Sequence, residues 1–119
     1  MIVYGIRNCD TVKRARAWLD ENNIDYEFHD YKTTGVDEKQ LRKWLKQVDW
    51  TQLVNRNGMT WRKLPDEQKA KIVDADSAIE LMLAQTSVIK RPLIEVDGKT
   101  LLLGFKLDEY LRCLKNNQR

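Results

Sequence analysis

Residues 1–31 read MIVYGIRNCDTVKRARAWLDENNIDYEFHDY, and the spacing of apolar side chains changes twice within this stretch. The apolar run of Met1–Tyr4, which a glycine ends, is typical of a short buried strand. From Cys9 to about residue 22, apolar side chains recur every three or four positions, which predicts an amphipathic helix. Alternation over Asp25–Tyr31 predicts a second strand. Strand, helix and strand in about thirty residues indicate a βαβ unit with parallel strands.

The middle of the chain, from about residue 35 to 87, has helical spacing throughout. We expect three or four short helices there, forming an insertion between the two halves of the fold. Asp37 and Ser77 are the expected starts of two of these helices, because both side chains are favourable N-caps.

The last third returns to strands. Asp97-Gly98 joins the β-prone runs Leu93–Val96 and Thr100–Leu103, which predicts an antiparallel hairpin. Helical spacing over 107–114 predicts a closing helix, and residues 115–119 are expected to fray. The predicted fold class is therefore α/β, with β-α-β, a helical insertion, and then β-β-α in a single domain of residues 1–119.

Composition and charge exclude several classes of protein. Basic residues number 21 and acidic residues 18, in mixed runs that do not favour nucleic-acid binding. No apolar run approaches the roughly 18 residues of a membrane-spanning helix, and no acid or histidine cluster has metal-ligand spacing. The two cysteines are too few and too far apart for a secreted disulfide scaffold, so we expect a cytoplasmic protein. For so small a fold we expect a monomer, with no bound metal or cofactor.

Cys9 is the candidate catalytic residue. It stands where the first predicted strand has ended and the first helix begins, and the unpaired N–H groups of a helix start stabilise a thiolate. Thr11 adds a hydroxyl donor, Arg7 and Lys13 add positive charge, and the same N–H groups suit an anionic substrate. The alternative is that Cys9 is a small buried hydrophobic residue. For Cys113 we expect burial or partial exposure without chemistry, and we expect no disulfide between the two cysteines.

Arg91-Pro92 directly precedes the third predicted strand. An X-Pro bond in a tight turn is where a cis peptide occurs, although an ordinary trans proline also opens strands. Arg91 carries a guanidinium fork that suits oxyanions or carboxylates, and its alternative role is that of a solvated loop cation. The single histidine, His29, is expected on the polar face of its strand rather than in catalysis.

Four motifs together resemble the arsenate reductase-like family of the thioredoxin-fold superfamily, which includes the Spx regulators and the YffB proteins. They are residues 4–15, 57–64, 89–94 and 104–105, and they look closest to the YffB branch. The resemblance implies that Cys9 is the nucleophile, that Arg91 holds an oxyanion, and that Pro92 is the cis proline beside the cysteine. Because no resolving cysteine follows Cys9 closely, we expect glutathione as co-substrate, with a binding site made of Asn8, Thr11, Lys13, Arg56, Arg91 and Pro92.

The departures from the family pattern separate the possible functions. Glutaredoxin-dependent arsenate reductases use two further arginines, which align near Asn55 and Gly104, so we expect little or no arsenate reduction. Val12 stands where redox-switched Spx proteins have a second cysteine. The preferred prediction is a glutathione-dependent thiol-disulfide reductase, whose partners are glutathione and glutaredoxin or a disulfide-bearing protein. The alternatives are an Spx-like RNA polymerase-binding regulator without a CxxC switch, and an arsenate reductase.

Overall fold

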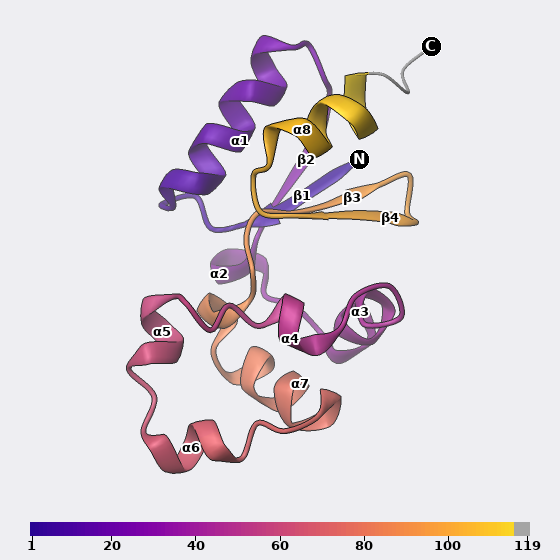
Figure 1. Ribbon diagram of the computed structural model, residues 1–119. Helices are drawn as coiled ribbons and strands as arrows, with labels where there is room; N and C mark the ends of the chain where they lie inside the picture. Colours follow the sequence, from indigo (N-terminus) through magenta and orange to yellow (C-terminus); the bar gives the residue numbers. More distant parts are fainter. Residues whose placement is uncertain (116–119) are drawn as a thin grey trace. The chain divides into compact units, whose positions relative to one another are not determined.

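The computed structural model describes residues 1–115, except for the side chain of Thr100. Strands β1 (Ile2–Gly5), β2 (Glu27–Asp30), β3 (Leu93–Val96) and β4 (Thr100–Leu103) form one sheet in the order β2-β1-β3-β4 (Figure 1). β1 is parallel to β2 and antiparallel to β3, which pairs antiparallel with β4. The predicted α/β fold class and its order of strands and helices are confirmed.

The hairpin between β3 and β4 has the turn that its sequence predicts. Asp97 and Gly98 both have positive φ, 48° and 77°. Two such residues in succession match the right-handed twist of the strands, and aspartate followed by glycine adopts this conformation readily.

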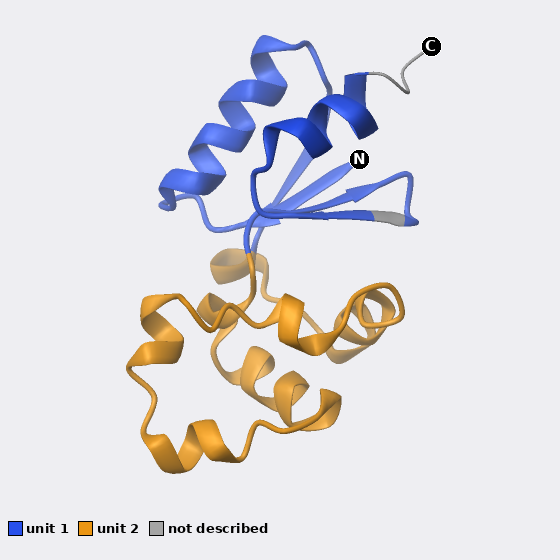
Figure 2. Cartoon of the chain, viewed as in Figure 1, with its two compact units in different colours: residues 1–30, 91–119 blue, residues 31–90 orange. Residues whose placement is uncertain are grey.

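Two compact units divide the chain (Figure 2). Unit 1 comprises Met1–Asp30 and the chain from Arg91 onward, and unit 2 comprises Tyr31–Lys90. Unit 2 therefore contains the whole helical insertion predicted at about residues 35–87. The expected fraying of residues 115–119 falls, beyond Lys115, outside the described residues.

The hydrophobic core of unit 1 lies between the sheet and two helices on the same face of it (Figure 1). These helices are α1 (Asp10–Glu21) and α8 (Leu107–Tyr110), which continues as the π-helical turn η2 (Leu111–Lys115). The buried residues of the cluster are Val3, Ala15, Leu19, Ile24, Ile94, Leu102, Tyr110 and Leu114. Half-buried Cys113 packs against it, and both cysteines are free, as predicted.

Unit 2 consists of short helices. They are α2 (Tyr31–Thr34), α3 (Glu38–Trp44), α4 (Trp50–Leu53), α5 (Met59–Arg62), α6 (Asp66–Ala70), α7 (Ala75–Ala84) and the 3-10 turn η1 (Thr86–Val88). The prediction of three or four helices at about residues 35–87 was wrong, because five α-helices, α3 to α7, lie there and three of them have only four or five residues. A helix of one turn is too short to establish a repeat in its apolar side chains.

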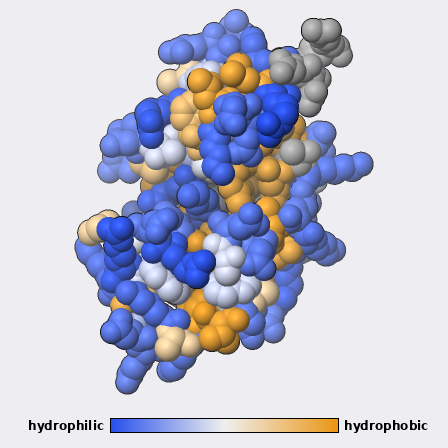
Figure 3. Space-filling model, viewed as in Figure 1, coloured by the Kyte–Doolittle hydropathy of each residue, from blue (hydrophilic) through white to orange (hydrophobic). Residues whose placement is uncertain are grey.

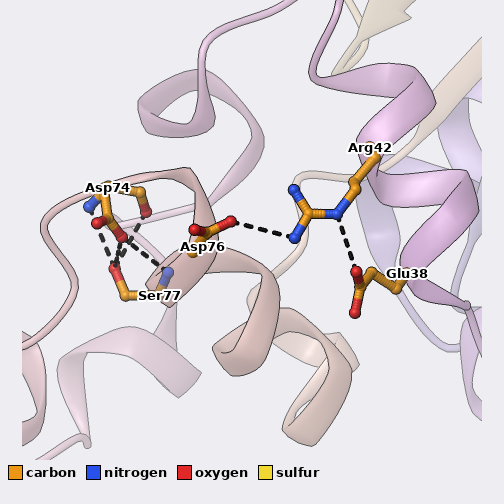
Figure 4. Close-up of polar contacts among 5 residues, drawn as sticks. All are labelled: Glu38, Arg42, Asp74, Asp76 and Ser77. Atoms are coloured by element: carbon orange, nitrogen blue, oxygen red, sulfur yellow. Dashed lines mark hydrogen bonds and ion pairs between the residues drawn. The ribbon is translucent and has the colours of Figure 1, made fainter.

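The caps of α3 and α7 show where the sequence is ambiguous. Asp37 caps α3 as predicted, by accepting a hydrogen bond from the N–H of Gln40 at 2.8 Å. Ser77 was predicted to start the next long helix, and that prediction was wrong. Asp74 is the N-cap of α7, and its carboxylate accepts from the Ser77 N–H at 2.8 Å while the Ser77 hydroxyl accepts from the Asp74 N–H at 3.1 Å (Figure 4). Both residues belong to one capping box, so either could be taken for the cap from sequence.

An ion-pair network links two helices of unit 2. Arg42 on α3 donates to Glu38 of the same helix at 2.9 Å and to Asp76 at the start of α7 at 3.1 Å (Figure 4). The side chains are exposed, so the network contributes little to stability on its own.

The second strand is shorter than predicted. The ladder between β1 and β2 ends at the pair formed by Gly5 and Asp30, and Tyr31 begins α2. Alternation of side chains does not reveal where the neighbouring strand ends, and this explains the error.

Hydrophilic side chains cover much of the face shown in Figure 3. Among residues 1–115, no helix has the length and apolar character needed to span a membrane.

Candidate active site at the start of α1

Close packing between β1 and α1 sets the position of the turn that joins them. A Cβ atom added to Gly5 would lie 2.8 Å from Cγ2 and 3.4 Å from Cγ1 of Val12. Val12 is fully buried, so no open space is available to take such an atom. Glycine at position 5 therefore allows α1 to approach the sheet, and the chain reaches the helix through the three residues Ile6–Asn8.

Cys9 is the N-cap of α1. Its backbone is extended, with φ −139° and ψ 122°, and its carbonyl accepts the helical hydrogen bond from the Lys13 N–H at 2.9 Å. The side chain makes no capping hydrogen bond and is half-buried. The sulfur is therefore placed at the positive end of a 12-residue helix. This placement does not match the alternative in which Cys9 is sealed in the core.

Three other predicted site residues lie in the same turn. Asn8 is exposed in the loop, Thr11 is half-buried in the first turn of α1, and Lys13 is exposed one residue after the buried Val12. Asp10, also exposed, adds a negative charge to this turn. The side chains around Cys9 therefore carry charges of both signs. The positive potential at Cys9 comes from the backbone N–H groups at the start of α1.

Arg91 and Pro92 lie just before β3, at the same end of the two central strands as the turn that leads from β1 to Cys9. Tyr4 near the end of β1 pairs with Leu93 at the start of β3, so the antiparallel register brings these two ends together. The Arg91-Pro92 peptide bond is cis, as the resemblance implies. Pro92 is buried and its carbonyl accepts from the Gly104 N–H at 2.8 Å, while Arg91 is half-buried.

A buried hydrogen bond supports this segment from the other side. The Tyr110 hydroxyl donates to the carbonyl of Gly104 at 2.8 Å, and Gly104 has a φ of 76°. Burial raises the pKa of Tyr110 well above its usual value, with a smaller contribution from Glu109, so the hydroxyl keeps its proton. Tyr110, Gly104 and Pro92 thus form one chain of contacts from the closing helix to the start of β3.

Sequence reasoning missed the contact between Arg7 and Asp30. The Asp30 carboxylate is 6% exposed, and its Oδ2 atom accepts from both the Arg7 N–H and Nη1 at 3.2 Å. Arg7, predicted only as a positive charge near Cys9, is thus paired with a buried acid. The signal in the sequence was weak: an acid ending one parallel strand and a cation just after the other.

Two guanidinium groups make cation–π contacts with the ring of Phe28 on β2. That of Arg7 lies 5.3 Å and that of Arg16 4.0 Å from the ring centre. Arg16 also donates to the Tyr26 hydroxyl at 3.0 Å. These cation–π contacts lie beside the core of unit 1 and hold both arginines against β2.

Arg56 is the predicted site residue that belongs to unit 2. It is exposed, and its guanidinium lies 5.9 Å from the ring centre of Trp50. The neighbouring Asn55 is tied to η1, because its N–H donates to the Val88 carbonyl at 2.7 Å. A role for Arg56 in glutathione binding stays a prediction.

A model of the ArsC family matches residues 4–113. The chain belongs to the ArsC family. The resemblance that the four motifs indicate is therefore confirmed, and the match covers Cys9, Arg91 and Pro92. Among residues 1–115, apart from the side chain of Thr100, no group of three or more histidine, cysteine or acidic side chains is arranged to hold a metal ion.

This ArsC-family chain is similar to a YffB protein, to an arsenate reductase-related protein and to the regulator Spx. The structure of the YffB (PA3664) protein is 51% identical with a TM-score of 0.89, covering 95% of this chain and 97% of that one. An arsenate reductase (ArsC) related protein from Brucella melitensis is 54% identical with a TM-score of 0.75, covering 96% and 93%. The global transcriptional regulator Spx of Streptococcus agalactiae is 27% identical over 115 residues, 94% of this chain and 81% of Spx. The thioredoxin-like fold class and the likeness to YffB are confirmed.

Proposed function

We propose that this ArsC-family protein is a glutathione-dependent thiol-disulfide reductase with Cys9 as its nucleophile. The observation that carries the proposal is the half-buried Cys9 side chain at the N-cap of α1, which makes no capping hydrogen bond. Cysteines at helix N-termini are the ones whose thiolate is favoured at neutral pH, and the thiolate is the form that attacks a disulfide.

The first step of the proposed cycle transfers a glutathionyl group. The Cys9 thiolate attacks the glutathione sulfur of a mixed disulfide between glutathione and a second thiol. A disulfide bond forms between Cys9 and glutathione, the original disulfide breaks, and the second thiol leaves as a thiolate that takes up a proton.

The second step uses external glutathione, because Val12 stands where a resolving cysteine would follow. A glutathione thiolate attacks the glutathione sulfur attached to Cys9 and leaves as glutathione disulfide. Cys9 returns as a thiolate, so two electrons have passed to the substrate and none remain on the protein. A reducing cytoplasm, the compartment we propose, supplies the glutathione for this step.

The remaining site residues are assigned to binding in this proposal. The guanidinium of Arg91 and the ammonium of Lys13 suit the two carboxylates of glutathione, and the exposed amide of Asn8 and the Thr11 hydroxyl suit its peptide groups. The backbone before the cis Pro92 lies at the sheet edge from which the turn to Cys9 leaves.

The test is selective glutathionylation of the intact protein. Wild type, Cys9→Ser and Cys113→Ser are treated with glutathione disulfide, and the adduct is located by mass spectrometry after digestion. We expect an adduct in wild type and Cys113→Ser, none in Cys9→Ser, and its removal by reduced glutathione. Equal labelling of Cys9 and Cys113 would contradict the proposal.

Spx-like regulation is the second candidate, and the similarity to Spx over 94% of this chain supports it. In this case exposed helix surfaces bind RNA polymerase and Cys9 is dispensable. Recovery of polymerase subunits in stoichiometric amounts by both wild type and Cys9→Ser would favour regulation over catalysis. For arsenate reduction, we expect little or no turnover with glutathione and glutaredoxin, because Asn55 and Gly104 replace the two arginines.

A further inference from the structure

Asp30 is a charged residue in a buried position beside the turn that leads to Cys9. It ends β2 and pairs in register with Gly5, the last residue of β1, and its side chain is 6% exposed. A carboxylate taken out of water is costly unless donors satisfy it. The Oδ2 atom of Asp30 accepts from both the backbone N–H and the guanidinium of Arg7 at 3.2 Å.

The backbone contact fixes the middle of a very short connection. Ile6, Arg7 and Asn8 are the three residues between Gly5 and Cys9, and Ile6 is buried at 7% exposure. The Arg7 N–H is held by Asp30, and the Cys9 carbonyl is held by the first turn of α1. Few backbone torsions remain free between these two anchors, so the direction of the Cys9 side chain depends on both.

We propose that Asp30 is a positioning residue for Cys9, which acts by holding the backbone of the turn through the Arg7 N–H. The proposal rests on the function proposed above for Cys9. Thiol-disulfide exchange requires the attacking sulfur to approach along the line of the disulfide bond, so a displaced turn slows it even when the thiolate is present.

Substitutions at Arg7 and Asp30 can separate the backbone contact between these residues from their ion pair. The Arg7 side chain is 62% exposed, and an exposed cation adds little to a pair in water. The Arg7→Met variant removes the guanidinium but keeps the N–H that donates to Asp30. Asp30→Asn removes the charge but keeps an oxygen that accepts, whereas Asp30→Ala removes both.

An effect of charge alone would have the opposite sign. A role of Asp30 through charge alone would mean that its carboxylate repels a negatively charged attacking sulfur. If Asp30 acted through charge, Asp30→Ala would leave Arg7 without its partner carboxylate, favour the thiolate and speed the reaction. Positioning predicts a slower reaction.

The experiment compares two reactions of Cys9 in a Cys113→Ser background. Exchange with glutathione disulfide needs the thiolate and the correct direction of approach, whereas alkylation by iodoacetamide depends mainly on the thiolate. We expect Asp30→Ala to slow exchange about tenfold and alkylation by less than about threefold. Asp30→Asn should exchange within about threefold of wild type, and Arg7→Met, which keeps the backbone contact, should lose less than Asp30→Ala.

Two matched controls test for a general effect of the substitutions. Glu27→Ala removes an exposed acid from the same strand, and Leu114→Ala lowers stability through the core beneath the closing helix. Both should exchange at the wild-type rate at a temperature where all variants are folded.

Several outcomes would overturn the proposal. Exchange by Asp30→Ala at or above the wild-type rate refutes the positioning role alone, as does Asp30→Asn being as slow as Asp30→Ala. A parallel loss of exchange and alkylation also refutes it. A wild-type Cys9 that does not exchange at all refutes the proposed function and the positioning role together.

Discussion

Replacing Gly5 by alanine tests whether α1 packs against β1 as closely as the structure shows. The new methyl group would lie 2.8 Å from Cγ2 of Val12, a fully buried side chain. Valine has one strongly preferred rotamer in a helix, so it does not rotate away, and the helix itself has to shift. Overpacking of this kind costs about 1–3 kcal/mol, and the lower entropy of unfolded alanine offsets about 0.4–1 kcal/mol. We expect a net loss of about 1–2 kcal/mol in the free energy of unfolding.

A double-mutant cycle identifies the contact responsible. Val12→Ala removes both γ-methyl groups and should by itself lower stability by about 2 kcal/mol, from lost burial and a cavity. In Gly5→Ala/Val12→Ala the new methyl group enters that cavity instead of meeting a methyl group. The double variant should therefore lose less than the sum of the single losses, by about 1 kcal/mol or more.

Urea unfolding followed by tryptophan fluorescence measures all four free energies of the cycle. Gly98→Ala is the matched control, because Gly98 has a φ of 77° but no atom within 4 Å of an added Cβ. It should lose stability through backbone strain and be additive with Val12→Ala within about 0.5 kcal/mol. A Gly5→Ala variant within about 0.5 kcal/mol of wild type, or additivity of Gly5→Ala with Val12→Ala, would refute the close approach.

Two further substitutions test contacts in each unit. Tyr110→Phe leaves the buried Gly104 carbonyl without its hydroxyl donor and should lower the free energy of unfolding by about 1–3 kcal/mol in urea. The raised pKa of Tyr110 means that this loss should be undiminished up to about pH 10, so a smaller difference at about pH 9 than at about pH 7 would contradict it. In α7, hydrogen bonds from the Ser77 N–H and hydroxyl hold the pKa of Asp74 below its usual 3.8. The resulting stabilisation is present above that value and is lost as the pH falls through the lowered one, so the difference in melting temperature between wild type and Asp74→Ala should shrink below about pH 4; an unchanged difference at about pH 2.5 would count against the capping box.

Local patterns in the sequence were sufficient to predict which strands and helices form in unit 1, although not where β2 ends. The change from helical to alternating spacing predicted α1 and β2, and Asp97-Gly98 predicted the hairpin of β3 and β4. These features depend on neighbours within four residues, whose side chains share a face or whose backbone needs a positive φ. The same local patterns predicted Cys9 at a helix start, and Cys9 is the N-cap of α1.

The same patterns failed where short elements or long-range partners decide the structure. Four-residue helices such as α4 carry no repeat, and Asp74 and Ser77 are both acceptable caps three residues apart. The end of β2 follows from the length of β1, which alternation within residues 25–31 does not report. The first two errors arise because a local pattern is too short or fits two residues equally well, and the third arises because the deciding strand lies outside the window that the pattern covers.

From the sequence alone it follows that a cysteine begins the first helix after a short strand, and that an arginine and a proline precede the third strand. Only the tertiary structure decides that Asp30 meets Arg7, 23 residues away, and that Val12 packs where a Cβ of Gly5 would stand. Periodicity and capping are properties of adjacent turns of chain. Contacts between separate strands and helices depend on the register and packing of the whole unit, and those contacts hold the Cys9 turn in place.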